Sequence, residues 1–333
     1  MQFKRLTLQD KNNIFNLISG RINTDRNTEK KEGIVTRGHG NRFIVFSDNE
    51  YIPCQLRGIV KHKTSHSTPV AVGDNVLISL IDDGEGVIEE ILPRKSVLSR
   101  PVTGRESHEH VIAANVDSLI IVTSIKQPLL KSGLIDRFLI AAQVGQLHPV
   151  IVINKIDLGP EPHINEIIET YRDLGFDLFL TSANEEKTKP ENELNLFGKY
   201  LNNHKSILAG HSGVGKSSLL NLLIPGLNLP TSSISKSTNR GRHATSWMEL
   251  IQLPGGGFVI DSPGVKVLGL WQVEKENILK YYPEMMDFQG ECRFMPCTHT
   301  HEPDCAIKKA VESGKIMKFR YRNYLQIYES LES

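Results

Sequence analysis

The sequence contains no apolar run that could cross a membrane. A transmembrane helix needs about 20 consecutive apolar residues, and no stretch of the 333 residues approaches that length. Residues 1–20 also lack the charged start, apolar middle and small-residue cleavage site of a signal peptide. We therefore expect a cytoplasmic protein that makes no membrane contact.

The chain has almost no net charge, because 39 Lys and Arg residues balance 38 Asp and Glu residues. This balance argues against a uniformly basic nucleic-acid binder. The charge is nevertheless uneven: residues 1–31 carry seven basic side chains against three acidic ones, and residues 306–324 carry six against Glu312 alone. Such basic ends are typical of contacts with a polyanion and equally of solvated helix faces and terminal tails.

Cysteine is scarce, and its placement argues against a disulfide framework. The chain has four cysteines, and in a large cytosolic protein such a small number favours metal binding over disulfides. Cys54 lies alone in the strand-like stretch EYIPCQL, where we interpret it as a small buried apolar residue.

The other three cysteines lie close together near the C-terminus. The spacing Cys292-x4-Cys297-x-His299-x5-Cys305 supplies three thiolates and one imidazole, which is the ligand set of a closed tetrahedral zinc site. A closed site leaves no position for water, so the predicted role is structural. On spacing alone His301 fits the fourth position as well as His299 does.

The length of the chain predicts two or three domains. Residues 33–92 carry about five short strand signals separated by Gly and Asp turns, a pattern typical of an oligonucleotide/oligosaccharide-binding (OB) barrel and also of an SH3-like barrel. The polar, basic stretch 93–110 is interpreted as a linker. From residue 116 apolar strands alternate with helical patterns, which predicts a mostly parallel sheet covered on both faces.

A phosphate-binding loop follows one of these strands. The stretch GHSGVGKSS fits G-x-x-x-x-G-K-[ST] between a strand and a helix. The glycines let successive backbone amides surround phosphate groups, while Lys216 reaches the β and γ oxygens and Ser217 ligates Mg²⁺. The predicted phosphate-binding residues are Gly210, His211, Ser212, Gly213, Val214, Gly215, Lys216, Ser217 and Ser218.

A guanine-recognition tag ends an earlier strand, VIVINKID, at Asn154, Lys155, Ile156 and Asp157. One carboxylate, Asp157, can accept hydrogen bonds from both N1–H and the exocyclic amine of guanine, a pair that adenine lacks. Asn154 is expected at the opposite edge of the purine, and the Lys155 stem against its face. The later strand end Thr181-Ser182-Ala183 is expected to bring a backbone N–H to guanine O6.

Two further segments supply the remaining sequence motifs of a GTPase. RGRHATS supplies Thr245 as a second Mg²⁺ ligand, and FVIDSPG supplies Asp261, which can hold the metal through water, and Gly264, whose amide can sense the γ-phosphate. The guanine tag precedes the phosphate loop, the reverse of the usual GTPase order. All the elements nevertheless follow one another as in an unbroken circular permutation, which proteins tolerate when the original termini lie close together.

The group that orients the attacking water is not evident. Many GTPases place a glutamine after D-x-x-G, but this chain has Val265 there. We expect His243 to take that role, with Lys216 and Thr245 as the other catalytic residues. The alternative is that His243, flanked by Arg240 and Arg242, contacts RNA phosphate.

The chain resembles the ribosome small-subunit-dependent GTPase A family of circularly permuted GTPases. The resemblance runs from about residue 33 to the C-terminal region and is carried by VAVGDNV, GEGVIEEILPRKSVLSRP, GHSGVGKSSLLN, RGRHATS, DSPG and the cysteine cluster. It implies a GTPase that binds the small ribosomal subunit and its rRNA late in assembly and is stimulated by that subunit. It also favours His299 as the metal ligand. One departure is Ala244, where many relatives carry threonine.

Together these features predict a multidomain α/β protein. We expect an OB-type barrel with a basic N-terminal tail over 1–100, a circularly permuted P-loop GTPase domain over 110–270, and a zinc-bound helical domain over 271–333. The expected cofactors are one structural Zn²⁺ and the Mg²⁺ that accompanies GTP. The expected partners are GTP, GDP and the small ribosomal subunit, bound by a monomer. The alternatives are an adaptor that holds GTP without useful hydrolysis and, more remotely, a P-loop ATPase.

Overall fold

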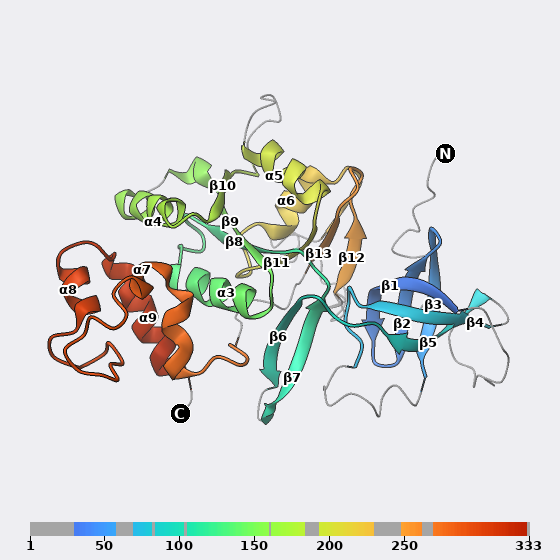
Figure 1. Cartoon of the computed structure of the whole chain (residues 1–333). Helices are drawn as coiled ribbons and strands as arrows, with labels where there is room; N and C mark the ends of the chain where they lie inside the picture. Colours follow the sequence, from blue (N-terminus) through green and yellow to red (C-terminus); the bar gives the residue numbers. More distant parts are fainter. Residues whose placement is uncertain are drawn as a thin grey trace.

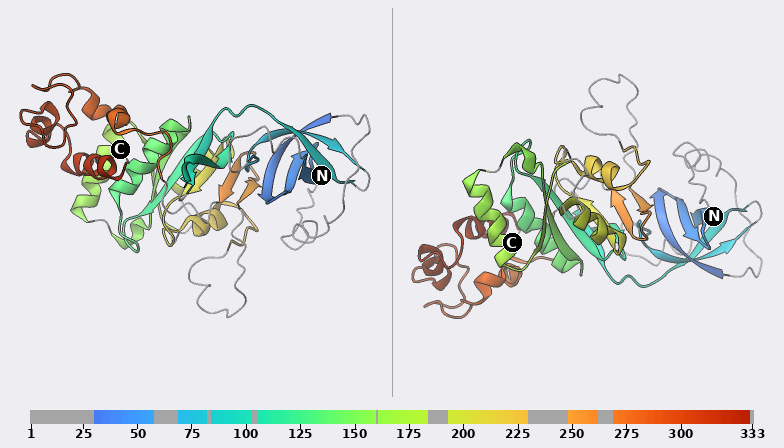
Figure 2. Two further views of the ribbon diagram at one scale, coloured as in Figure 1. Left: turned by 90° about the horizontal axis from the view of Figure 1, so that it is seen from below. Right: turned by 90° about the horizontal axis from the view of Figure 1, so that it is seen from above.

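The computed structural model describes residues 30–57, 69–81, 84–102, 105–159, 161–183, 193–229, 248–261 and 269–331. Over these residues the chain forms a β-barrel, a central α/β part and a C-terminal group of short helices (Figure 1). Figure 2 shows the barrel and the C-terminal helices at opposite ends of the α/β part. None of the helices in these ranges has the length and apolarity that a membrane span requires.

The N-terminal barrel is closed and has the strand order of an OB fold. Its strands are β1 (Lys30–His39), β2 (Arg42–Ser47), β3 (Glu50–Leu56), β4 (Asn75–Leu80) and β5 (Gly86–Ile91). They pair in the order β1-β2-β3-β5-β4, and β4 returns to β1 from Lys30↔Ser79 to Ile34↔Asn75. Cys54 is buried in the barrel interior, so the interpretation of this cysteine as an apolar core residue is confirmed.

Strands β6 (Val97–Val102) and β7 (Arg105–Ala114) pair as an antiparallel hairpin, so the linker prediction for 93–110 was wrong where it overlaps these strands. Leu98, Ile112 and Ala113 of this hairpin are buried in the core of the α/β part. Val111 and Ala114 are buried in a separate small cluster with Ala71. The rest of the stretch is rich in Arg, Ser and Thr residues. Its few apolar residues are too short a pattern to predict strands from the sequence.

The central part is a parallel sheet with one antiparallel edge strand. Its members are β8 (Ser118–Ser124), β9 (His148–Asn154), β10 (Asp177–Thr181), β11 (Lys205–Ala209), β12 (Glu249–Gln252) and β13 (Phe258–Asp261). The order is β10-β9-β8-β11-β13-β12, and β12 alone runs antiparallel and also pairs with the barrel at Arg37↔Glu249. The carboxyl ends of the parallel strands meet at one edge of the sheet, which is where such sheets bind ligands.

Helices cover both faces of this sheet, as the near-continuous apolar strands predict. They are α3 (Ser132–Val144), α4 (Pro162–Asp173), α5 (Glu193–Asn202) and α6 (Lys216–Leu223). Phe138 of α3 and Ile164 of α4 belong to the core on one face. Phe197 of α5 and Leu219 of α6 belong to the core on the other. The fold is therefore multidomain α/β with a parallel sheet at its centre.

The C-terminal part consists of η3 (Lys275–Tyr281), α7 (Pro283–Met286), α8 (Ala306–Glu312) and α9 (Lys318–Ser330). Tyr282, Met285 and Ile327 contribute to its own hydrophobic core, and Ile140 of α3 packs into the same core. The C-terminal helices are thus joined to the α/β part by buried apolar contacts along α3.

Candidate nucleotide and metal sites

The phosphate loop connects β11 to α6 and needs glycine at defined positions. Gly210 and Gly215 have φ values of +140° and +101°. A Cβ on Gly210 would lie 2.0 Å from the carbonyl oxygen of Val122, and one on Gly215 would lie 2.2 Å from Nδ2 of Asn154. Close packing against neighbouring strands therefore requires these glycines, and it places the loop at the carboxyl edge of the sheet.

Lys216 begins α6 and turns back over the loop. Its Nζ donates hydrogen bonds to the carbonyl oxygens of Gly210 at 2.7 Å and His211 at 3.1 Å. Ser217 and Ser218 follow in the first turn of the helix. The amine, the first-turn hydroxyls and the helix N-terminus thus lie together, the arrangement that binds phosphate in P-loop proteins.

Asn154 joins the guanine tag to the phosphate loop. Its Nδ2 donates to the carbonyl oxygen of Val214 at 2.8 Å, and its Oδ1 accepts from Thr181 Oγ1 at 3.2 Å. The side chain is completely buried. The expected contact with the purine edge stays a prediction. The link to Val214 was not foreseen, because the two residues are 60 positions apart in the sequence.

Lys155 is also held by the loops around it. Its backbone is left-handed, with φ +63°. Its Nζ donates to the carbonyl oxygen of Gly213 at 2.8 Å and to that of Gln127, in the loop 125–131 between β8 and α3. Burial lowers the pKa of Lys155, and the nearby Asp157 carboxylate partly offsets that effect. Sequence reasoning did not single out the loop 125–131.

Asp157 lies in the short helix η2 (Ile156–Leu158), and Ser182 donates a 2.6 Å hydrogen bond to its Oδ1. Ser182 is completely buried just past the end of β10, and Ala183 follows it. The structure therefore brings the predicted guanine tag and the predicted base loop together, with the Asp157 carboxylate oriented by Ser182.

Asp261 ends β13 and pairs in register with Leu208 of β11, two residues before the phosphate loop begins. It therefore lies at the same edge of the sheet as the loop. Thr245, Gly264 and His243, together with Ala244 and Val265, fall outside the described residues, so the roles expected for them stay predictions.

The predicted metal ligands form a compact cluster in the C-terminal part. The ligand atoms of Cys292, Cys297, His299 and Cys305 all lie within 4.8 Å of one another. Nδ1 of His299 is 3.5 Å from Sγ of Cys292 and 3.4 Å from Sγ of Cys305. Zinc bonds to sulfur and nitrogen are about 2.0–2.3 Å long. Ligand atoms arranged as a tetrahedron around the ion therefore lie farther from one another than from the ion, in agreement with the 3.4 and 3.5 Å separations between His299 and the two thiols. The donor set fits a zinc ion.

His301 is excluded from this cluster. It is exposed, and its Nδ1 contacts Oγ1 of Thr300 at 2.9 Å. His299, in contrast, is buried between the sulfur atoms, and its backbone is left-handed, with φ +60°. The spacing in the sequence allows either histidine as the fourth metal ligand, and the conformation of the loop selects His299.

Glu302 and two tyrosines support the loop that carries His299. The Glu302 carboxylate accepts hydrogen bonds from the Thr298 amide at 2.7 Å, Thr298 Oγ1 at 2.6 Å and the Thr300 amide at 3.0 Å. Burial opposes ionisation, but these bonds outweigh it and lower the pKa of Glu302 to about 2. Tyr321 and Tyr324 of α9 donate to the carbonyls of His299 and Thr298 at 2.8 and 2.9 Å.

Burial also raises the pKa of two ligand thiols, Cys297 and Cys305. It raises the pKa of Cys297 to about 12, so a metal cation must displace the proton of this thiol on binding. None of these supporting contacts was expected from the sequence, although two acidic residues, Glu302 and Asp304, are visible there between His299 and Cys305.

A phosphate loop, a guanine tag and a base loop meet at one sheet edge in permuted chain order, beside a closed barrel. These features define a circularly permuted P-loop GTPase. A family model described as RsgA GTPase matches residues 91–271, and one described as RsgA N-terminal domain matches residues 32–88. The chain belongs to the RsgA GTPase family and is a GTP hydrolase, as its resemblance to the small-subunit-dependent GTPases predicted.

Individual relatives match over nearly their whole length. The protein named small ribosomal subunit biogenesis GTPase RsgA from Chlorobaculum parvum is 39% identical over 313 residues, which cover 91% of this chain and 99% of that protein. The protein of the same name from Moorella thermoacetica is 40% identical over 294 residues, covering 88% and 95%.

Solved structures agree with this assignment. YjeQ from Thermotoga maritima has a TM-score of 0.69 at 34% identity, covering 91% of this chain and 99% of its own. YloQ, described as a circularly permuted GTPase, has a TM-score of 0.63 at 29% identity, covering 93% and 97%. The permuted order of motifs in this chain therefore agrees with the description of YloQ as circularly permuted.

Proposed function

We propose that this protein binds the small ribosomal subunit and its rRNA late in subunit assembly and hydrolyses GTP there, at a rate that the subunit stimulates. Relatives that match most of the chain carry the name small ribosomal subunit biogenesis GTPase. The observation that carries the proposal is the hydrogen bond from Asn154 to Val214, because it unites a guanine tag and a phosphate loop in one site. We propose that the protein acts as a monomer in the cytoplasm.

In this proposal Asp157 selects guanine. Its carboxylate, oriented by Ser182, accepts the N1–H and the exocyclic amine of the base. Adenine would place an acceptor against the carboxylate and leave it unpaired, which costs several powers of ten in affinity. The Lys155 stem lies along the purine face, and the amide that follows Ser182, at Ala183, meets O6.

The phosphates bind at the amides of the loop. Lys216, whose amine contacts two loop carbonyls, rotates to reach the β and γ oxygens. Ser217, Thr245 and Asp261 are proposed to hold Mg²⁺, which neutralises charge on those oxygens when it is bound with GTP. The Gly264 amide is proposed to contact the γ-phosphate.

His243 is proposed to orient the attacking water, because Val265 occupies the position where many GTPases have a glutamine. A His243→Ala variant should lower the subunit-stimulated rate about 10²-fold while GTP and subunit binding persist. If His243 instead contacts RNA phosphate, subunit affinity should fall and saturating subunits should restore the rate.

We propose that the cysteine cluster holds one structural Zn²⁺. Its ligand spacing and burial support this assignment, and its supporting bonds to α9 suit a role in holding the C-terminal fold.

The deciding experiment measures phosphate release from GTP with and without small ribosomal subunits. We expect the subunits to raise the rate and ATP to compete poorly with GTP. Tight GTP binding with no subunit-dependent release would instead indicate an adaptor that uses GTP for stability. Effective competition by ATP would contradict the guanine assignment.

A further inference from the structure

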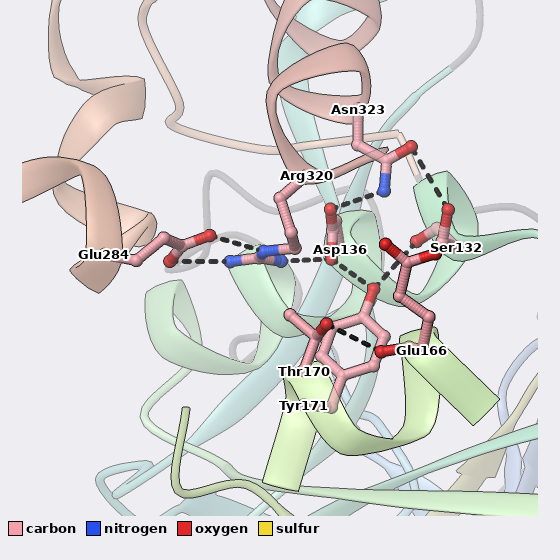
Figure 3. Close-up of polar contacts among 8 residues, drawn as sticks. All are labelled: Ser132, Asp136, Glu166, Thr170, Tyr171, Glu284, Arg320 and Asn323. Carbon is pink, nitrogen blue, oxygen red and sulfur yellow. Dashed lines mark hydrogen bonds and ion pairs between the residues drawn. The ribbon is translucent and has the colours of Figure 1, made fainter. Parts of the chain in front are cut away.

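Arg320 of α9 lies in a buried polar network between the C-terminal part and the α/β part (Figure 3). Its Nε and Nη2 contact the Glu284 carboxylate at 2.6 and 3.2 Å, and its Nη1 contacts Oδ1 of Asp136 in α3. Asn323 and Tyr171 donate further hydrogen bonds to the Asp136 carboxylate, at 2.7 and 2.6 Å. Arg320 is one of the six basic residues in 306–324 for which the sequence favoured contact with a polyanion or a solvated helix face. That prediction was wrong for this side chain.

The network reaches the first residue of α3. Ser132 Oγ donates to Oδ1 of Asn323 at 3.3 Å, and the Tyr171 hydroxyl lies 3.3 Å from the Ser132 carbonyl. Figure 3 shows Ser132, Asp136 and Asn323 side by side where α9 crosses α3. Residues from α9 and α4 therefore hold the start of α3 in place.

The loop that supports the guanine tag runs directly into this point. Residues 125–131 are followed directly by Ser132, the first residue of α3. The carbonyl of Gln127 in this loop accepts a hydrogen bond from Lys155. At its other end, Ser124 Oγ donates to the Pro128 carbonyl at 2.8 Å. The loop is thus attached to the end of β8 at one side and to the start of α3 at the other.

We propose that Arg320 and Asn323 are positioning residues for guanine-nucleotide binding. By fixing the start of α3 they fix the loop 125–131, and the loop fixes Lys155. This inference rests on the proposed guanine site. A buried ion pair is a poor source of net stability but can specify one geometry. When the loop leaves its binding-competent position part of the time, the apparent nucleotide affinity falls by the same fraction.

Arg320→Lys tests the proposal, because lysine keeps the charge but loses the planar fork that contacts two carboxylates. The exposed Arg322 in the same helix provides the matched control, Arg322→Lys. We expect Arg320→Lys to raise the Kd for a fluorescent GDP analogue about tenfold and to speed amide hydrogen exchange in residues 125–131. Arg322→Lys should change neither.

Asn323→Ala is the second variant, since it removes the bonds to Ser132 and Asp136 and leaves Arg320 in place. Its control is Glu329→Ala at an exposed position of α9. We expect a smaller rise in Kd, about threefold, again with faster exchange in the loop. Zinc content and circular dichroism verify that each variant keeps its fold.

Two outcomes would overturn the inference: unchanged GDP affinity in both folded variants, or weaker binding without faster exchange in residues 125–131. In the second case the loss of GDP affinity would not be caused by a change in the loop. Failure of the proposed guanine site is recognised separately, because the unaltered protein would then not bind GDP in the same assay. Failure of subunit-stimulated hydrolysis would leave GDP binding by the unaltered protein intact.

Discussion

Asn154 donates a 2.8 Å hydrogen bond to the carbonyl of Val214 and so connects the guanine tag to the phosphate loop. The amide lies against Gly215, where a Cβ would approach Nδ2 to 2.2 Å. Two motifs that the sequence separates are therefore packed as a single unit. The permuted chain order leaves this contact intact, because it depends on neighbouring strands and not on their sequence.

Replacing Asn154 should weaken nucleotide binding. Asn154→Ala leaves the Val214 carbonyl and the Thr181 hydroxyl without this buried partner, at a cost of about 1–3 kcal/mol, or about 5- to 150-fold in the Kd for GDP. Fluorescence titration with a GDP analogue measures the change. Asn165→Ala, at an exposed position of α4, is the control and should bind normally. Normal binding by Asn154→Ala would show that the link is dispensable.

Asp157→Asn should change the base that the site prefers. The new amide would donate to the C2 carbonyl of xanthine, whereas guanine presents an amine there, so the preference for GTP over xanthosine triphosphate should be lost. Competition between the two nucleotides measures this preference. Asp173→Asn, exposed at the end of α4, is the control. An unaltered preference for GTP would mean that Asp157 does not contact the base.

Gly215→Ala should damage the site more than an alanine at another left-handed glycine. Both Gly215 and Gly175 have positive φ, but a Cβ on Gly175 meets nothing within 4 Å. Gly175→Ala therefore carries only the conformational cost, about 1 kcal/mol. Gly215→Ala also displaces Asn154, and we expect at least about tenfold weaker GDP binding than in the control. Equal affinities of the two variants would contradict the close packing.

Cys297→Ser should lose the bound metal. Serine is a poor zinc ligand, and removing one of four ligands should lower the metal content measured after purification and chelator competition, with a lower unfolding temperature. Cys54→Ala removes the barrel thiol instead and should retain the metal. Full zinc content in Cys297→Ser would refute the ligand assignment.

Several features could be predicted because they depend on short stretches of chain. The phosphate loop is a contiguous segment whose glycines and lysine determine its conformation and chemistry. The same holds for the tag at Asn154–Asp157 and for the closely spaced ligands Cys292–Cys305. The apolar strands likewise predicted a parallel sheet covered by helices.

Other features were decided by tertiary packing. Strands β6 and β7 form a hairpin and not a linker because a few of their apolar side chains pack into the core of the α/β part. His299 is chosen over His301 because the loop, held by Glu302 and Tyr321, turns only His299 toward the thiols.

The sequence by itself determined which chemical groups this protein has and the order in which the chain presents them. Only the tertiary structure decided which distant groups meet: Asn154 with Val214, and Arg320 with Asp136. The physical reason is that local conformation follows from adjacent residues, whereas burial depends on surfaces contributed by remote segments. Whether a basic side chain such as Arg320 is buried or exposed to solvent therefore depends on partners that are remote in the sequence, and it can be decided only from the folded structure.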